Sequence, residues 1–342
     1  MWGVSIFREL NIEFSNFIMS SFEFESGRIL KDVNVEYSTM GFPKYDEDGN
    51  ITNAIVFCPT LKGERSVLAN LHNALTMDNI SNDDEFAFIR DKKYFFIRIV
   101  SLGSPESCSP STTDLKHNFP NYTFRDCVNF KKQFLKEKFN LDSVLAIVGE
   151  GVGGCEVFTW ACEYPDYMEF ILSMNNLAKL SGTSYIFFKS MESVLESNDK
   201  IYSDVYDPSL SKLVVAVNKM LFLNYLSRNM LSNLSRDELD ALLDNFVEDG
   251  LFRDVHDLKY LCDCLLEYDV NDKLSNIKAK TILIAIEGQF LVNVEKEVLP
   301  LENAIDDVEV MVIQLDEGEF DNGESYSSVF KIFSFLNEYG VE

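Results

Sequence analysis

The sequence predicts an α/β fold in which a doubly wound, mostly parallel sheet is interrupted by a helical insertion. Three observations predict it. Compact apolar runs recur along the chain, amphipathic helical patterns separate them, and one long stretch carries helical patterns alone. Such alternation is typical of a parallel sheet with helices on both faces. The 342 residues are enough to bury the core that this fold requires.

The expected strands are short runs that are apolar almost throughout, as in strands buried on both faces of a parallel sheet. β-Branched and aromatic residues are frequent in these runs, which favours strand over helix. In chain order the runs cover residues 54–58, 94–100, 143–148, 170–174, 281–286 and 308–313.

A helix is expected between the second and third of these runs. It begins at Thr123, and Asp126 three residues later completes a start that resembles a capping box. Cys127, Phe130 and Phe134 lie on one face of this helix, which is therefore its buried face.

The stretch from about residue 177 to residue 272 contains amphipathic helices and no strand pattern. Ser235 and Glu238 form a capping box at the start of one helix, and residues 254–268 form another. A final helix is expected over residues 325–339. We expect residues 1–176 and 276–342 to build the sheet, with residues 177–275 as a helical cap over its ligand edge. A separate helical domain is the less favoured alternative.

The chain is strongly acidic, because 56 Asp and Glu residues against 30 Lys and Arg give a formal net charge of −26. Such a surface repels nucleic acid and anionic membranes, so neither is expected as a partner. The acidity is best explained by solubility and self-repulsion, with adaptation to high salt as the alternative.

The sequence indicates a cytoplasmic protein. Residues 1–13 mix charged and apolar residues, unlike a signal peptide, and no later stretch has the ~20 uncharged apolar residues of a membrane span. The seven cysteines are scattered and are expected to be reduced thiols. Cys262 and Cys264 have the wrong spacing for a zinc knuckle, so we expect packing there. No metal or other cofactor is expected.

The run at 143–148 leads into a glycine-rich turn, Gly149-Glu150-Gly151-Val152-Gly153-Gly154, and then into a helix expected from Cys155 to about Tyr164. This order is the frame of a nucleophile elbow, in which the pattern G-x-S-x-G raises a side chain above the sheet. The central position here is Gly151. It offers no nucleophile for covalent acyl transfer.

Two other interpretations of this turn are open. A glycine-rich turn before a helix can cradle phosphate. This one lacks the P-loop Lys-Ser/Thr and the dinucleotide-binding spacing, and it carries the acidic Glu150. The favoured interpretation is structural, with glycines that the turn geometry requires.

Further segments agree in order and spacing with one enzyme family. They are residues 24–41, Cys58-Pro-Thr-Leu61-Lys-Gly63, Leu102-Gly-Ser104, Ser109-Pro110, Phe119-Pro120, Trp160-Ala161 and Tyr164-Pro165-Asp166. Together with the elbow they resemble the homoserine O-acetyltransferase family of the α/β-hydrolases, over most of the chain outside the insertion. The resemblance implies an α/β-hydrolase fold with an inserted cap. It also implies an oxyanion-hole loop at Leu61, although Pro59 replaces the family's usual His.

The resemblance implies a catalytic triad, and none of its members stands at the matching positions. The nucleophile position is Gly151, and the acid position is Gln289, with Glu287 nearby as a weak substitute. The His position is Glu319, within Gly318-Glu319-Phe320-Asp321. The only histidines are His72, His117 and His256, which we expect to be surface or hydrogen-bonded core residues and not a relocated base.

We therefore interpret the chain as a catalytically inert family member, a pseudoenzyme that binds a small molecule or a protein partner. A pocket lined by Leu61, Gly151 and Val152 is expected in the crevice between sheet and cap, and the resemblance implies a homodimer formed through the cap. One alternative is an active acyltransferase or hydrolase with an unconventional site, in which Glu319 or Glu150 acts on a bound water. The other is an interaction scaffold whose pocket is filled.

Overall fold

The computed structural model describes residues 12–59, 94–224, 228–251 and 253–313. These residues form an eight-stranded sheet with the order β1-β2-β4-β3-β5-β6-β7-β8. The strands are β1 (Glu13–Glu23), β2 (Ile29–Gly41), β3 (Ala54–Cys58), β4 (Phe95–Ile99), β5 (Val144–Glu150), β6 (Met168–Met174), β7 (Lys280–Ile286) and β8 (Val308–Ile313).

The pairing confirms the prediction of a doubly wound, mostly parallel sheet. β1 pairs with β2, and β2 with β4, in antiparallel fashion, while the pairs from β4 to β8 are parallel. The chain moves from β3 outward to β4, returns past β3 to β5 and then continues in the other direction. This reversal defines a switch point beside the carboxyl ends of β3 and β5, where such sheets bind ligands.

The central strands are formed by the predicted apolar runs. Every residue of β3 and β4 is buried, and β5 is buried except at its last residue, Glu150. Continuous burial of this kind requires cover on both faces of the sheet.

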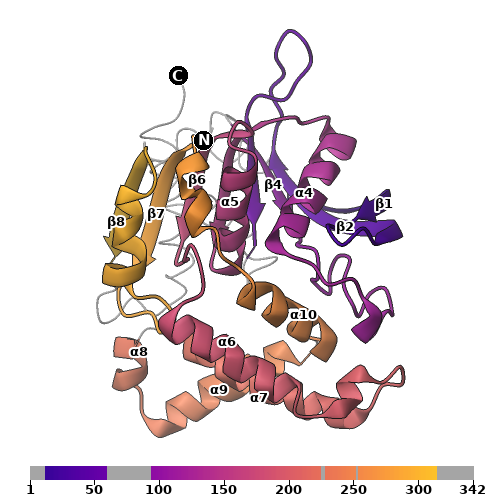
Figure 1. Cartoon of the computed structure of the whole chain (residues 1–342), viewed down its shortest axis with the longest axis vertical. Helices are drawn as coiled ribbons and strands as arrows, with labels where there is room; N and C mark the ends of the chain where they lie inside the picture. Colours follow the sequence, from indigo (N-terminus) through magenta and orange to yellow (C-terminus); the bar gives the residue numbers. More distant parts are fainter. Residues whose placement is uncertain (1–11, 60–93, 225–227, 252, 314–342) are drawn as a thin grey trace, which may run out of the picture.

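Two helices cover one face of the sheet, α4 (Phe124–Phe139) and α5 (Val152–Glu163). The predicted capping box begins α4, since the Asp126 amide donates to Thr123 Oγ1 and the Thr123 amide donates to Asp126 Oδ2 at 2.9 Å. The predicted apolar face of α4 is buried. Figure 1 shows both helices lying in front of the sheet.

Between β6 and β7 the described residues form helices, which Figure 1 shows grouped at the end of the sheet where β6 leads into α6. They include α6 (Gly182–Leu195), α7 (Ser211–Leu221), α8 (Arg228–Asn233), α9 (Arg236–Gly250) and α10 (Val255–Leu266). We call α6–α10 the helical segment. The capping box predicted at Ser235 is confirmed at the start of α9. The division of the chain at residues 176 and 275 stays a prediction.

The helix after the glycine-rich turn differs from the prediction. It begins at Val152, three residues before Cys155. Glycine is a poor helix former, but Gly153 and Gly154 lie against neighbouring strands, and this packing favours a helix that begins immediately after the turn. The helix predicted over residues 325–339 lies outside the described residues.

Candidate functional site

Gly151 forms the sharp turn between β5 and α5. Its φ of 53° and ψ of −116° form a combination that glycine adopts and other residues avoid. The Gly151 amide donates to the carbonyl oxygen of Met174 at 2.9 Å, which holds the turn against β6. Among the described residues, no atom lies within 4 Å of a Cβ atom at Gly151. A side chain at this position would therefore project into space that no described residue fills.

Gly149 and Gly153, on either side of Gly151, have no room for a side chain. A Cβ atom at Gly149 would lie 2.4 Å from the carbonyl oxygen of Gly153, and one at Gly153 would lie 2.1 Å from the carbonyl oxygen of Cys58. Packed interiors do not admit such approaches. Gly149 and Gly153 therefore allow β5, α5 and the end of β3 to come together, as the structural interpretation of the turn requires.

The start of α5 has no side-chain cap, and its first turn contains no acidic residue. The first N–H groups of a helix lack partners within the helix and carry partial positive charge. Such groups stabilise a negatively charged oxygen, as anion sites and oxyanion holes do. The turn thus keeps an electrostatic feature of acyl-transfer sites without a nucleophile at its centre.

A buried ion pair lies behind the turn, between Lys131 of α4 and Glu156 of α5. Both side chains are almost completely inaccessible to solvent. Ser101 Oγ donates to Glu156 Oε1 at 2.5 Å and accepts from Lys131 Nζ at 3.0 Å. Burial acts to lower the pKa of Lys131, but Cys58 and Glu156 raise it above its ordinary value. The lysine is therefore charged, and the pair ties α4 to α5.

Neither of the two cysteines near the turn offers a reactive thiolate. Burial raises the pKa of the Cys58 thiol to about 12. Burial also raises the pKa of Cys155, whose Sγ donates to Asn176 Oδ1 at 3.2 Å. A thiol of this kind is neutral at neutral pH and a poor nucleophile.

Sequence reasoning did not identify the polar side chains around the first turn of α5. Ser173 Oγ, Asn176 Nδ2 and Tyr268 OH are buried and have no hydrogen-bond partner in the described part of the chain. Ser173 and Asn176 lie where a side chain at Gly154 would be. The signals in the sequence were weak: Ser173 interrupts an apolar strand, and Lys131 lies four residues after Cys127 on an otherwise apolar helix face.

The position matched to the acid lies in the described part of the chain, and the position matched to the base lies outside it. Gln289 follows β7 and is half-buried, while Glu287 is exposed to solvent. Glu319, matched to the family's His, lies outside the described residues, as does Leu61 of the expected pocket. Among the triad positions, the structure therefore places Gly151 and Gln289 at the carboxyl ends of β5 and β7.

The described histidines are occupied by other contacts. Both ring nitrogens of His256 have protein partners, Asp254 Oδ1 and the carbonyl oxygen of Ile201. His117 Nε2 lies 3.7 Å from Asp204 Oδ1. His256 is thus a hydrogen-bonded core residue, as predicted, and His72 lies outside the described residues.

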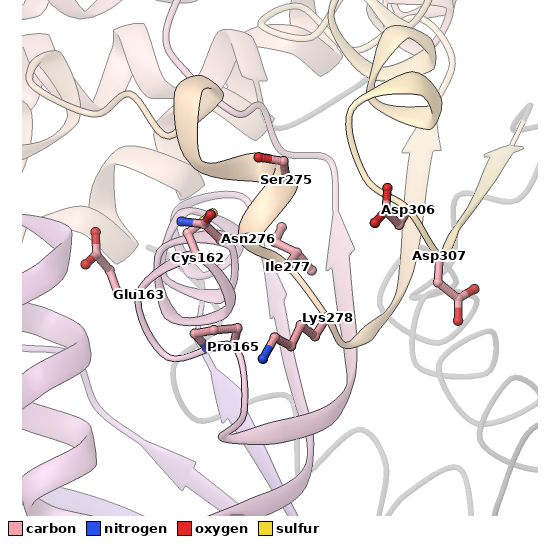
Figure 2. Close-up of a pocket in the computed structure, with 9 residues that line it drawn as sticks. All are labelled: Cys162, Glu163, Pro165, Ser275, Asn276, Ile277, Lys278, Asp306 and Asp307. Carbon is pink, nitrogen blue, oxygen red and sulfur yellow. The ribbon is translucent and has the colours of Figure 1, made fainter.

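A groove of about 760 Å³ lies at the other edge of the sheet. The groove is lined by Pro165, Lys278 and Asp307, which lie within three residues before β6, β7 and β8, so it is at the amino ends of these strands. Figure 2 shows Asp306 and Asp307 on one side and Glu163 and Pro165 on the other. This groove is distinct from the crevice predicted beside Gly151, which stays a prediction.

A metal-binding cluster and a membrane-spanning helix are both absent from the residues that the structure describes. They contain no group of three His, Cys, Asp or Glu side chains placed to hold a metal ion. They also contain no helix that is both long and apolar enough to cross a membrane.

The sequence is similar to those of known proteins. No protein-family model matches the sequence. A probable acyltransferase of Methanothermobacter thermautotrophicus is 30% identical over 324 residues, which cover 94% of this chain and 97% of that protein. A homoserine O-acetyltransferase of Methanosalsum zhilinae is 25% identical over 302 residues, which cover 78% of this chain but only 60% of that longer protein.

Solved structures agree with the fold. An acetylester hydrolase from Corynebacterium glutamicum superposes with a TM-score of 0.75 at 19% identity, covering 95% of this chain and 96% of that one. The likeness confirms the predicted α/β-hydrolase fold.

Two glycines of the turn predict different responses to substitution. Gly153→Ala forces a methyl group against the Cys58 carbonyl and should lower the free energy of unfolding by about 3 kcal/mol or more. Gly151→Ala meets no atom and carries only backbone strain, about 1–2 kcal/mol. Denaturant unfolding of the two variants measures this difference. An equal or reversed order would contradict the open space at Gly151.

The buried ion pair gives a second prediction. Lys131→Met leaves the Glu156 carboxylate buried without a cation and should destabilise the protein by about 3–5 kcal/mol. Adding Glu156→Leu should restore most of the loss, because no uncompensated charge remains. The exposed pair Lys278–Asp166, at 2.9 Å, is the matched control, and Lys278→Met should leave unfolding unchanged. No rescue in the double variant would refute this account of the pair.

Proposed function

Since this chain belongs to the acyltransferase and esterase family of the α/β-hydrolases, we propose that it is a non-catalytic member that acts by binding. One observation carries the proposal. The turn that presents the nucleophile in such folds has Gly151 at its centre, and no atom of the described residues occupies the place of a side chain there. Covalent acyl transfer has no atom with which to begin at this position.

Among the described residues, three candidate groups do not supply a substitute. The Cys155 thiol is buried and neutral, His256 uses both ring nitrogens in protein contacts, and the Gln289 amide neither ionises nor accepts a proton. Without a nucleophile and a base, a triad site retains only oxyanion donors and binding.

The proposed ligand is a small molecule in the crevice beside Gly151 and Val152, between the sheet and the proposed cap of residues 177–275. Support comes from the open space at Gly151 and from the uncapped start of α5. The site lies at the winding reversal of the sheet, the usual ligand position in this architecture. Seven free, buried cysteines support the proposed cytoplasmic location.

One observation favours a second candidate, an active acyltransferase or ester hydrolase with an unconventional site. The relative from Methanothermobacter thermautotrophicus, which covers 94% of this chain, is a probable acyltransferase. In this alternative a carboxylate, such as that of Glu150 or Glu319, acts on a bound water. Only the second candidate predicts turnover of an acyl substrate.

The decisive assay combines turnover with adduct detection. Purified protein with acetyl-CoA and homoserine, or with p-nitrophenyl acetate, should show no turnover above buffer and no acyl adduct by intact-protein mass spectrometry. Turnover that is lost in Glu319→Ala, or an acyl group on any side chain, would overturn the non-catalytic proposal and favour the second candidate.

Ligand binding can be tested by thermal shift across a metabolite panel. A ligand at ~100 times its Kd adds about 2.7 kcal/mol to the free energy of unfolding, so the melting temperature should rise by a few degrees. Gly151→Leu should abolish the shift by filling the open space, while Gly151→Ala, which has the same backbone strain, should retain it. A shift unaffected by Gly151→Leu would place the ligand elsewhere.

We also propose a homodimer formed through the helical segment, as the family resemblance implies. Large apolar side chains exposed there support it: Tyr185, Ile186, Tyr202, Val205 and Tyr206. Ile186→Lys should shift sedimentation from dimer to monomer, because a charge would be buried in the interface. Ile29→Lys is the control, since Ile29 is exposed to a similar degree on β2. A dimer that persists in Ile186→Lys would contradict an interface at this face of α6.

A further inference from the structure

The start of α10 carries a cluster of ionisable side chains that no step of the proposed function uses. Asp254 is the N-cap residue of α10, and its side chain accepts from the His256 amide. His256 and Asp257 follow in the first turn, with 3% and 5% of their surfaces exposed. Burial of an ionisable group is unfavourable unless the group is paired. The contacts of these two residues therefore indicate which of them is protonated.

The partners of His256 determine its charge. Nε2 lies 2.8 Å from the carbonyl oxygen of Ile201, and Nδ1 lies 2.9 Å from Asp254 Oδ1. A carbonyl and a carboxylate can only accept hydrogen bonds, so both ring nitrogens must donate. Neutral imidazole has one N–H, and only the imidazolium ion has two. The observed geometry therefore requires protonated His256.

Deprotonation would remove one of these two bonds. Nδ1 without hydrogen would face the Asp254 carboxylate, and Nε2 without hydrogen would face the Ile201 carbonyl. Either arrangement sets two acceptors against each other in a buried place. Ile201 belongs to the short 3₁₀ turn η3 (Asp199–Tyr202), which follows α6 and precedes α7.

We propose that His256 is a proton-controlled latch that holds the η3 turn against the start of α10 while its imidazole is charged. The latch joins two parts of the helical segment, α6–η3–α7 on one side and α10 on the other. When the proton leaves, the η3 turn and the loop after it, where Val205 and Tyr206 are exposed, separate from α10 more often.

Other charged groups lie around the latch. Asp257 is the second carboxyl near the ring and accepts from the amide and hydroxyl of Ser111, at 2.9 and 2.6 Å. On the side of η3, Lys200 lies 4.0 Å from Asp207. Lys116 lies in the segment between β4 and α4, and its ammonium group donates to the carbonyl oxygen of Asp204.

Two further groups titrate or carry charge in this neighbourhood. His117 Nε2 lies 3.7 Å from Asp204 Oδ1, so it connects the segment before α4 to the chain two residues after η3. Lys259, one turn along α10, contacts Glu196 at 3.2 Å and Asp263 at 2.6 Å. His117 is thus the second histidine whose protonation could affect this region, and it needs its own control.

The direction of the pH dependence follows from these partners. Burial lowers the pKa of His256, but the Asp254 carboxylate and the Ile201 carbonyl raise it, and the net pKa is above its ordinary value of 6.5. Its contribution to stability is therefore complete below that value and is lost as the pH rises through the folded-state pKa. Burial raises the pKa of Asp257 to about 6, so above this pH its negative charge also favours the imidazolium ion.

Amide hydrogen exchange of the full chain tests the latch. The Ile201 and Ser203 amides, which donate to Asn198 and Lys200, report on η3. After correction for intrinsic exchange, their protection should fall at least about tenfold between about pH 6 and pH 9, the cost of losing a charged hydrogen bond. Protection in β5 should remain constant over the same range. Protection in η3 that is also constant would overturn the proposal.

Variants assign the effect to one histidine. His256→Gln cannot gain or lose a proton, so η3 protection should lose its pH dependence, while His117→Asn should retain it. The reverse result would assign the effect to His117 and overturn the proposal. Because His256→Gln could fail to fold, NMR of the imidazole nitrogens in the unmodified protein provides a second test. Both nitrogens should show imidazolium shifts at pH 6.5, and a neutral ring at that pH would contradict the latch.

Discussion

The close approach of three backbone segments governs the geometry of this site. The carbonyl of Cys58 at the end of β3 occupies the place of a side chain at Gly153, and the carbonyl of Gly153 occupies the place of one at Gly149. Any side chain at these positions would separate β3, β5 and α5. The sharp turn, the early start of α5 and the burial of Lys131 with Glu156 all depend on that approach.

Gly151 differs from its neighbours because no atom of the described residues requires it to lack a side chain. Its unusual backbone angles arise from the turn itself, and in related folds a nucleophile tolerates them because the surrounding structure fixes the turn. Within the described part of the chain, the first N–H groups of α5 have no side-chain cap, and such groups can bind an electronegative group.

Much of the fold could be predicted from the sequence because its signals are local. Apolar runs gave the central strands, and the capping boxes at Thr123 and Ser235 gave two helix starts. The start of α5 was misplaced because glycine propensity is overridden there by packing against distant strands. The partners of Lys131 and His256 could not be predicted either, since they are set by contacts between segments far apart in the chain.

The interior charges and the surface charge lead to different conclusions about ligands. Lys131, Arg98 and His256 are buried cations, and each lies against a carboxylate. These buried cations are offset locally, so they do not contribute to the excess of acidic residues that gives the net charge of −26. A field of that sign slows the approach of polyanions such as acyl-CoA, whereas it favours neutral or cationic molecules. At short range the start of α5 acts in the opposite direction, because its first N–H groups carry partial positive charge and attract an electronegative atom.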